Sequence, residues 1–168
     1  MKNENSNSKK KKPVAIAVCG TKNTGKTTLI ESLLPILTGQ GYVVAVVKHH
    51  GHKFDPDIPG TDTYRFNHNG AIGTVITDDD CFMLVKNQFK SPEELIEYFP
   101  EADIVILEGY KESSFPKIEM RRYNEPLDID PDTVVAIVSD IPDIETEVPV
   151  FKYDELDETA DFIIGFAN

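Results

Sequence analysis

The sequence predicts an α/β fold in which a mixed, mostly parallel sheet is flanked by helices. Short apolar runs, typical of strands buried on both faces, recur at 14–18, 43–47, 104–107 and 134–138. Segments with helical spacing of apolar residues separate several of these runs, as in βαβ units. With 168 residues, the chain is long enough to bury a substantial core. We therefore expect residues 13–168 to form a single domain.

The first half of the fold is expected to be a βαβ unit with a right-handed crossover. After the first apolar run, a helix should begin at Lys26, because Leu and Ile residues recur from there at helical spacing. Pro35 should kink this helix or end it early, and two glycines further on should close it. The second apolar run completes the unit. The segment 48–60 after it is rich in His, Asp, Pro and Gly and is expected to be a loop.

The middle of the chain is expected to hold a short helix and a β-hairpin. The helix should span residues 62–69 and stop at the glycine that follows. Two apolar runs at 71–76 and 81–85 are separated by the turn-like stretch TDDD, which favours a hairpin. Another helix should begin at Pro92, because Ser91 can cap it and a glutamate follows three residues after this serine.

The last third of the chain is expected to add three strands and a closing helix. The apolar runs at 104–107 and 134–138 predict buried strands, and the more polar stretch 117–122 predicts an edge strand. Apolar residues at 156–166 recur at helical spacing and predict a helix that covers the sheet. We see no internal repeat in the sequence.

Composition and charge limit the functions and cellular locations that the protein can have. The net charge of -12 argues against a broad nucleic-acid-binding surface, because it would repel the phosphate backbone. The polar leader 1–12, which ends in four lysines, is expected to be disordered. No apolar stretch approaches the ~20 residues that span a bilayer, so we expect a cytoplasmic protein without a membrane partner. The two cysteines, Cys19 and Cys81, are expected to be reduced core thiols.

The segment between the first strand and the first helix matches a phosphate-binding loop. Its sequence GTKNTGKT has a Gly, four further residues and Gly-Lys-Thr, in the strand-to-helix context that the mechanism requires. Glycines let the backbone approach a phosphate, the helix N-terminus supplies free N–H groups, and the lysine can bridge β- and γ-phosphates. We therefore expect a nucleotide to bind at Gly20, Thr21, Lys22, Asn23, Thr24, Gly25, Lys26, Thr27 and Thr28.

A magnesium site is expected beside this loop. The motif threonine, Thr27, would place its hydroxyl on Mg²⁺. The stretch DIVILEGYK supplies Glu108 directly after four apolar residues, so its carboxylate should lie at the carboxyl edge of the sheet, where open α/β folds bind ligands. An ordinary acid at a strand end is the alternative. We take Lys26 and Glu108 as candidate catalytic residues for nucleotide hydrolysis.

The segment KHHGHKFDPDIPGTDTYR, after the second strand, has three competing interpretations. Its histidines, His49, His50 and His52, are of the type that binds transition metals, although their spacing does not aim all three at one ion. Asp62 and Arg65 are one helical turn apart and could form a switch that contacts the γ-phosphate region or a partner subunit. The segment could also be a polar surface loop. We favour the switch, with Asp62 and Arg65 as candidate catalytic residues.

A candidate for recognition of the base follows the last apolar run. Asp140 stands after the strand at 134–138, where an acidic residue could accept hydrogen bonds from N1 and N2 of guanine. The Asn-Lys-x-Asp motif usual in phosphate-loop GTPases is absent, and a plain strand-ending turn is the alternative. This feature alone therefore leaves GTP and ATP both open.

Three stretches taken together resemble the MobB family, the adapter proteins of molybdopterin-guanine dinucleotide biosynthesis. They are GTKNTGKTTLIESLLP, VVKHHGHKFDPDIPGTDTYRFNHNGA, and DIVILEGYK followed by PKIEMRR, and they lie within residues 14–138. The resemblance puts Asp62 and Arg65 in the Asp-x-x-Arg segment of the family. It puts Lys111 and Lys117 in the Glu-Gly-x-Lys and Pro-Lys-Ile motifs.

The resemblance implies a function that residue patterns alone do not provide. A member of this family is expected to bind GTP and Mg²⁺, to hydrolyse GTP weakly and to form a homodimer. Its expected partner is the molybdenum cofactor guanylyltransferase, with molybdopterin as a further candidate ligand. Two alternatives stay open: a metal-delivery GTPase that uses the His-rich loop, and a small-molecule kinase or ligase on the same phosphate loop.

Overall fold

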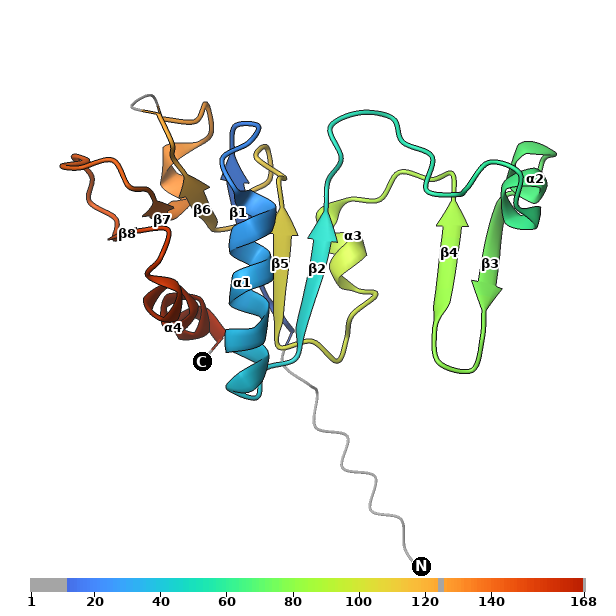
Figure 1. Cartoon of the computed structure of the whole chain (residues 1–168), viewed down its shortest axis with the longest axis horizontal. Helices are drawn as coiled ribbons and strands as arrows, with labels where there is room; N and C mark the ends of the chain where they lie inside the picture. Colours follow the sequence, from blue (N-terminus) through green and yellow to red (C-terminus); the bar gives the residue numbers. More distant parts are fainter. Residues whose placement is uncertain (1–11, 124–125, 168) are drawn as a thin grey trace, which may run out of the picture. The chain divides into compact units, whose positions relative to one another are not determined.

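The computed structural model describes residues 12–123 and 126–167. These residues form two compact units (Figure 1). The sheet unit comprises the chain up to His49 and from Pro92 onward, and the hairpin unit comprises His50–Ser91. All but the last residue of the predicted leader lies outside the described residues. The single domain predicted for residues 13–168 stays a prediction.

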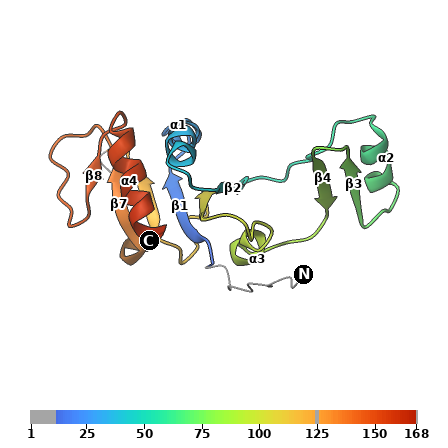
Figure 2. The same ribbon diagram turned by 90° about the horizontal axis from the view of Figure 1, so that it is seen from below.

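The sheet unit contains a six-stranded sheet in the order β2-β5-β1-β6-β7-β8, and all of its strand pairs are parallel. Figure 1 shows these strands beside α1 and α4, and Figure 2 gives the view from below. The strands are β1 (Val14–Gly20), β2 (Val44–Lys48), β5 (Ile104–Glu108), β6 (Lys117–Met120), β7 (Val134–Val138) and β8 (Val150–Phe151). The helices are α1 (Lys26–Gly39), α3 (Pro92–Ile96), the 3-10 helix η1 (Pro131–Thr133) and α4 (Leu156–Ala167).

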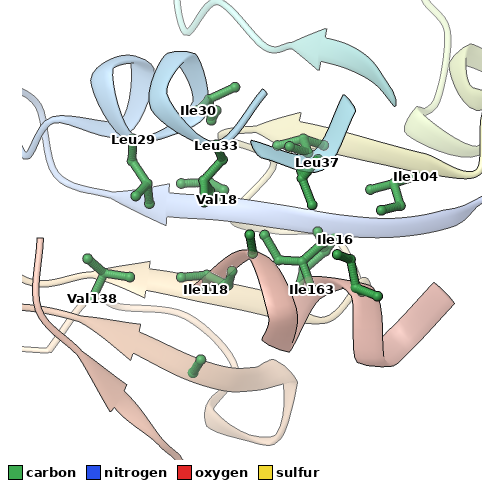
Figure 3. Close-up of a cluster of buried hydrophobic side chains, with 14 of the residues drawn as sticks. Ile16, Val18, Leu29, Ile30, Leu33, Leu37, Ile104, Ile118, Val138 and Ile163 are labelled. Atoms are coloured by element: carbon green, nitrogen blue, oxygen red, sulfur yellow. The ribbon is translucent and has the colours of Figure 1, made fainter. Parts of the chain in front are cut away.

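The core of the sheet unit lies on both faces of the sheet, because alternate side chains of each strand point to opposite sides. On one face, α1 and α4 pack against Ile16 and Val18 of β1, and Leu33 and Ile163 of the two helices are fully buried there (Figure 3). On the other face, a second cluster around Leu107 includes apolar residues of α3. Burial of each of these aliphatic side chains contributes about 1.5–3 kcal/mol to the free energy of folding. The predicted α/β fold with helices on both faces is confirmed.

Pro35 does not end α1, so the predicted early stop is wrong. The helix continues to Gly39, with Pro35 inside it. Leu33 and Leu37, on either side of the proline, are both fully buried against the sheet. This packing offsets the loss of one backbone hydrogen bond at the proline, which would otherwise interrupt the helix.

The stretch predicted as a polar edge strand is instead an interior strand. β6 pairs with β1 on one side and β7 on the other, and Lys117 and Glu119 within it are buried. The Lys117 ammonium donates to the carbonyl oxygens of Ser113 and Phe115 and to the Thr133 hydroxyl. The Glu119 carboxylate accepts two hydrogen bonds from the Arg121 guanidinium and one from the backbone N–H of Leu127. Polar residues are tolerated inside the sheet because their polar groups are satisfied there.

The hairpin unit contains α2 (Asp62–His68) and the antiparallel strands β3 (Gly73–Thr77) and β4 (Phe82–Lys86). The short helix and the hairpin were both predicted. Asn67 of α2 donates a 2.9 Å side-chain hydrogen bond to Thr74 of β3, which ties the helix to the hairpin. This antiparallel pair forms a sheet of its own. The main sheet is therefore wholly parallel, where the sequence predicted a mixed one.

The two cysteines differ in their surroundings. Cys19 is buried in the sheet unit, as predicted, whereas Cys81 is exposed directly before β4, so its assignment to the core is wrong. Cys81 follows the hairpin turn, where its backbone N–H donates to the Asp78 carboxylate at 2.8 Å. Over residues 12–123 and 126–167, no helix has the length and apolar character to cross a membrane.

Candidate nucleotide-binding site

The phosphate loop connects β1 to α1, and its backbone turns sharply at two residues. Asn23 and Gly25 both have positive φ, at 65° and 91°. A β-carbon placed on Gly20 would lie 2.7 Å from the Thr24 hydroxyl oxygen and 2.8 Å from the carbonyl oxygen of Met120, so a side chain does not fit there. The buried Thr24 hydroxyl donates to the carbonyl oxygen of Thr21 and braces the loop. The loop is therefore tightly packed, with Thr24 and Met120 against Gly20.

The N-terminus of α1 is open to an anion. Gly25 is the N-cap residue, and no described side chain caps the helix. The first N–H groups of a helix have no partner within it, and together with the helix dipole they favour a negative group. The helix has 14 residues and no acidic residue in its first turn. This end of α1 therefore suits a phosphate.

Lys26 folds back over the loop. Its ammonium donates to the carbonyl oxygens of Gly20 at 3.0 Å and Thr21 at 2.7 Å. Partial burial lowers the pKa of Lys26 and nearby Lys48 adds to this, while Glu108 and Cys19 act in the opposite direction. The side chain is thus a partly desolvated cation beside the helix N-terminus, where it can meet phosphate oxygens.

Glu108 lies where the sequence predicted it, at the carboxyl end of β5. It is buried, with 8% of its surface exposed, and its carboxylate accepts a 3.0 Å hydrogen bond from the Thr27 hydroxyl. The Lys48 ammonium donates to both oxygens of this carboxylate, at 2.8 and 2.9 Å. Thr27, Glu108 and Lys48 therefore form one cluster beside the phosphate loop.

The Thr27 and Glu108 oxygens fit a magnesium ion chemically. A hydroxyl and a carboxylate are hard oxygen ligands, and magnesium usually takes one or two of these from protein together with phosphate oxygens and water. The two groups are within hydrogen-bond distance of each other and border the N-terminus of α1. These residues are the ones that would hold the ion.

A cavity of about 460 Å³ lies at the carboxyl ends of β6 and β7. Its lining includes Asp140, Arg121, Arg122 and Tyr153. Asp140 accepts a 3.3 Å hydrogen bond from the backbone N–H of Tyr153, and the Arg122 guanidinium lies 5.3 Å from the centre of the Tyr153 ring. A β-carbon on Gly25 would be 3.9 Å from this ring, so the cavity adjoins the phosphate loop.

Asp62 and Arg65 both lie on α2 in the hairpin unit. Arg65 Nη1 and Asp62 Oδ1 are 3.4 Å apart, and both side chains are largely exposed. The spacing of three residues does bring the two together on one face, as predicted. Their catalytic role stays a prediction.

The histidines do not form a common metal site. Over the described parts of the chain, no three His, Cys, Asp or Glu side chains are grouped so that they could hold a metal ion. His49 belongs to the sheet unit, with its ring 5.2 Å from that of Tyr110. His50 and His52 belong to the hairpin unit, where the edge of one ring meets the face of the other at 6.2 Å.

Sequence reasoning missed four residues of this region. The sequence pattern places Lys48 only in the loop, and it does not mark Arg121, Arg122 and Tyr153 as site residues. A signal for Lys48 was present, because it directly follows the apolar run of one strand as Glu108 follows another. The cavity residues carry no comparable signal, because they come together only through the pairing of β6, β7 and β8.

Known proteins are similar to this chain in sequence and in fold. Residues 15–140 match the family model described as MobB, molybdopterin guanine dinucleotide synthesis protein B. The chain is 30% identical over 161 residues to the molybdopterin-guanine dinucleotide biosynthesis adapter protein of Escherichia coli K12, which covers 89% of this chain and 90% of that protein. It is 31% identical over 158 residues to a probable adapter protein of the same name from Bacillus subtilis 168, with 89% and 91% covered.

A solved structure agrees with this relationship. The crystal structure of Bacillus subtilis MobB is similar with a TM-score of 0.73 and 25% identity, over 91% of this chain and 97% of that one. The α/β fold of this chain is thus shared with a solved MobB structure. From its sequence motifs, its family match and its fold, the chain belongs to the MobB family.

Proposed function

We propose that this protein binds GTP with Mg²⁺ on the loop at residues 20–28 and acts as an accessory protein in molybdopterin guanine dinucleotide biosynthesis. One observation carries the nucleotide part of the proposal: the uncapped N-terminus of α1 begins at Lys26, beside the paired Thr27 and Glu108. That arrangement supplies N–H groups and an ammonium for phosphates, and oxygen ligands for a cation.

The cavity at Asp140 is proposed to receive the base. The carboxylate can accept hydrogen bonds from N1–H and N2–H of guanine, whereas adenine presents an acceptor at N1 and no amino group at C2. Arg122 lines the same cavity and offers a planar cation for stacking on a base, while Arg121, which also lines it, is held by Glu119. Because the cavity adjoins Gly25, one nucleotide could reach both regions.

Hydrolysis is proposed to be weak and to depend on few side chains. Bound Mg²⁺ would neutralise charge on the phosphates. Lys26 would hold phosphate oxygens, and Glu108 would orient Thr27 through the hydrogen bond between them. Glu108→Gln keeps the size of the side chain and removes its charge, so it should retain GTP and lose most magnesium-dependent turnover. Equal turnover in the two proteins would contradict this role for Glu108.

The accessory role is supported by the relatives. The Escherichia coli protein is named an adapter in molybdopterin-guanine dinucleotide biosynthesis, and the match spans most of both chains. We propose that the partner is the guanylyltransferase that joins GMP to the cofactor. The test is to add this protein to the purified enzyme and measure dinucleotide formation. Stimulation that disappears with Lys26→Ala supports the proposal, and equal rates with and without the protein contradict it.

The hairpin unit is proposed to join two copies of the chain. Val75, Ile76, Phe82 and Leu84 are exposed on its two strands. A two-stranded sheet is marginally stable alone, and exposed apolar strands with open edges favour pairing with another chain. A second copy brings the same surface, which suits a symmetric interface.

Base selectivity tests the nucleotide proposal against the metal-delivery alternative. Isothermal titration with GTP, ATP and Ni²⁺ should give binding of GTP, weaker binding of ATP and no tight stoichiometric binding of nickel. Asp140→Asn should reduce the preference for GTP over ATP by about tenfold, because the amide cannot accept both hydrogen bonds from N1–H and N2–H of guanine. Tight nickel binding without nucleotide would favour the metal-delivery alternative instead.

A further inference from the structure

We infer that Lys48 is an exchangeable counterion for Glu108, which holds this carboxylate in the metal-free protein and releases it when a divalent cation binds. The inference rests on the proposed function, in which Thr27 and Glu108 hold the cation. It assigns Lys48 a role in setting how strongly nucleotide binding depends on the metal.

The Lys48 ammonium is placed among the same oxygens that the cation would need. It donates to both Glu108 oxygens, at 2.8 and 2.9 Å, and lies 3.4 Å from the Thr27 hydroxyl oxygen. The Thr27 hydroxyl in turn donates to Glu108 at 3.0 Å. One positive group cannot share this site with a divalent cation, because the two would repel each other at short range.

The register of the sheet places Lys48 beside Glu108. β2 and β5 are parallel neighbours, and Lys48 and Glu108 are paired residues at the last position of each strand. Parallel strands end at one edge of a sheet, so the backbone holds these two residues side by side. The ion pair therefore follows from the fold rather than from a mobile loop.

Lys48 is able to leave, unlike the buried Lys117 at the start of β6. Half of the Lys48 side chain is exposed, at 52%, and its ammonium is held by a single carboxylate with a long contact to Thr27. Lys117 is fully buried and donates to three separate acceptors. A flexible four-carbon stem with one solvent-facing side lets the Lys48 ammonium turn into water at low cost.

The positive charge of Lys48 should affect nucleotide binding and metal binding in opposite directions. Without metal, Lys48 neutralises Glu108 and so limits the repulsion between this carboxylate and nucleotide phosphates. With metal, Lys48 competes for the same carboxylate and weakens the binding of the cation. Removing the Lys48 charge should thus weaken metal-free nucleotide binding and strengthen metal binding.

The direct test uses Mn²⁺ as the probe, with free Mn²⁺ measured by electron paramagnetic resonance and no nucleotide present. Lys48→Met keeps the length of the side chain and removes its charge, so it should bind Mn²⁺ about tenfold more tightly than the natural protein. Lys48→Arg keeps the charge and should behave like the natural protein. Adding Glu108→Gln to Lys48→Met should abolish the gain. Equal or weaker Mn²⁺ binding by Lys48→Met would overturn the inference.

The second readout is the affinity for GTP in EDTA and in Mg²⁺. The ratio of the two dissociation constants should rise about tenfold in Lys48→Met, and it should stay unchanged in the matched control Lys86→Met, an exposed lysine of β4. An unchanged ratio in Lys48→Met would also overturn the inference. If neither protein bound GTP while Mn²⁺ responded as predicted, the proposed function would fail and the counterion role of Lys48 would stand.

Discussion

The two units of the chain bury their apolar side chains to very different extents. In the sheet unit, residues such as Ile16, Leu33 and Ile106 are fully buried. In residues 50–91, all of which the structure describes, Val85 is the only buried apolar residue, while Val75 and neighbouring strand residues are exposed. The sheet unit has a core of its own and carries the phosphate loop. The hairpin unit leaves apolar strand residues exposed, and this is the surface that we propose to join two copies of the chain.

The largest expected effect is on the core of the sheet unit. Leu33→Ala leaves a cavity between α1 and the sheet, so the free energy of unfolding should fall by about 2–5 kcal/mol. Leu84→Ala in the hairpin unit is the matched control, because this leucine is already 45% exposed, and it should cost less than ~1 kcal/mol in the monomer. Urea unfolding followed by circular dichroism measures both. Equal losses in the two variants would remove the contrast between the units.

The next effect concerns the shape of the phosphate loop. Gly20→Ala would push a β-carbon against the Thr24 hydroxyl and the Met120 carbonyl oxygen, at a cost of about 1–3 kcal/mol. The affinity for GTP should fall by about tenfold or more, because the loop must shift. Gly39→Ala is the control, because a β-carbon there meets nothing within 4 Å. Gly20→Ala with the natural affinity would show that this close approach does not shape the site.

The hairpin unit should determine the oligomeric state. Val75→Glu places a charge on an exposed apolar strand, so the proposed dimer should dissociate while the monomer stays folded. Val150→Glu, at an exposed valine of the sheet unit, should leave the dimer intact. Analytical ultracentrifugation separates the two outcomes. A dimer that survives Val75→Glu, or dissociates with Val150→Glu, would place the interface elsewhere.

The smallest effect is carried by the cysteines, one in each unit. Burial raises the pKa of the Cys19 thiol to about 11, and this thiol donates to the carbonyl oxygen of Gly109. At pH 8, a thiol reagent should therefore modify the exposed Cys81 first, and Cys19 only after unfolding. Mass spectrometry of the labelled peptides identifies which residue reacts, and rapid labelling of Cys19 in the folded protein would contradict its burial.

The same raised pKa gives a direction for stability against pH. The unfolded chain ionises Cys19 from pH 9.0 upward, while the folded protein keeps the thiol protonated to about pH 11. Deprotonation then favours the unfolded state, so the Cys19 contribution is complete below pH 9.0 and is lost as the pH rises toward 11. The difference in unfolding free energy between the natural protein and Cys19→Ala should shrink over that interval. A constant difference would contradict the raised pKa.

Much of the sheet unit could be predicted because its signals are local. The apolar runs and the glycine pattern at 20–28 specify the strands, the first helix and the loop between them. The interior position of β6 could not be predicted, because Lys117 and Glu119 look exposed until their hydrogen-bond partners are known. The same holds for Pro35, whose place inside α1 depends on packing against the sheet.

The candidate site divides in the same way. Lys26, Thr27 and Glu108 are found from motif and position, because each stands at the end of a recognisable element. The contact of Lys48 with Glu108 depends on which strands are neighbours, and the sequence does not state the strand order. The cavity at Asp140 depends on the side-by-side pairing of β6, β7 and β8, which the residue pattern does not show. The residue types were visible in the sequence, but the order of the strands in the sheet was not.

We propose that the sheet unit alone binds the phosphates of GTP, through Lys26 and the start of α1. The most direct measurement is isothermal titration of GTP in Mg²⁺ into the natural protein and into Lys26→Ala, with thermal unfolding as the check on folding. We expect one GTP per chain for the natural protein, and a loss of affinity of at least about a hundredfold for a folded Lys26→Ala. Equal GTP affinity in the two folded proteins would contradict the claim.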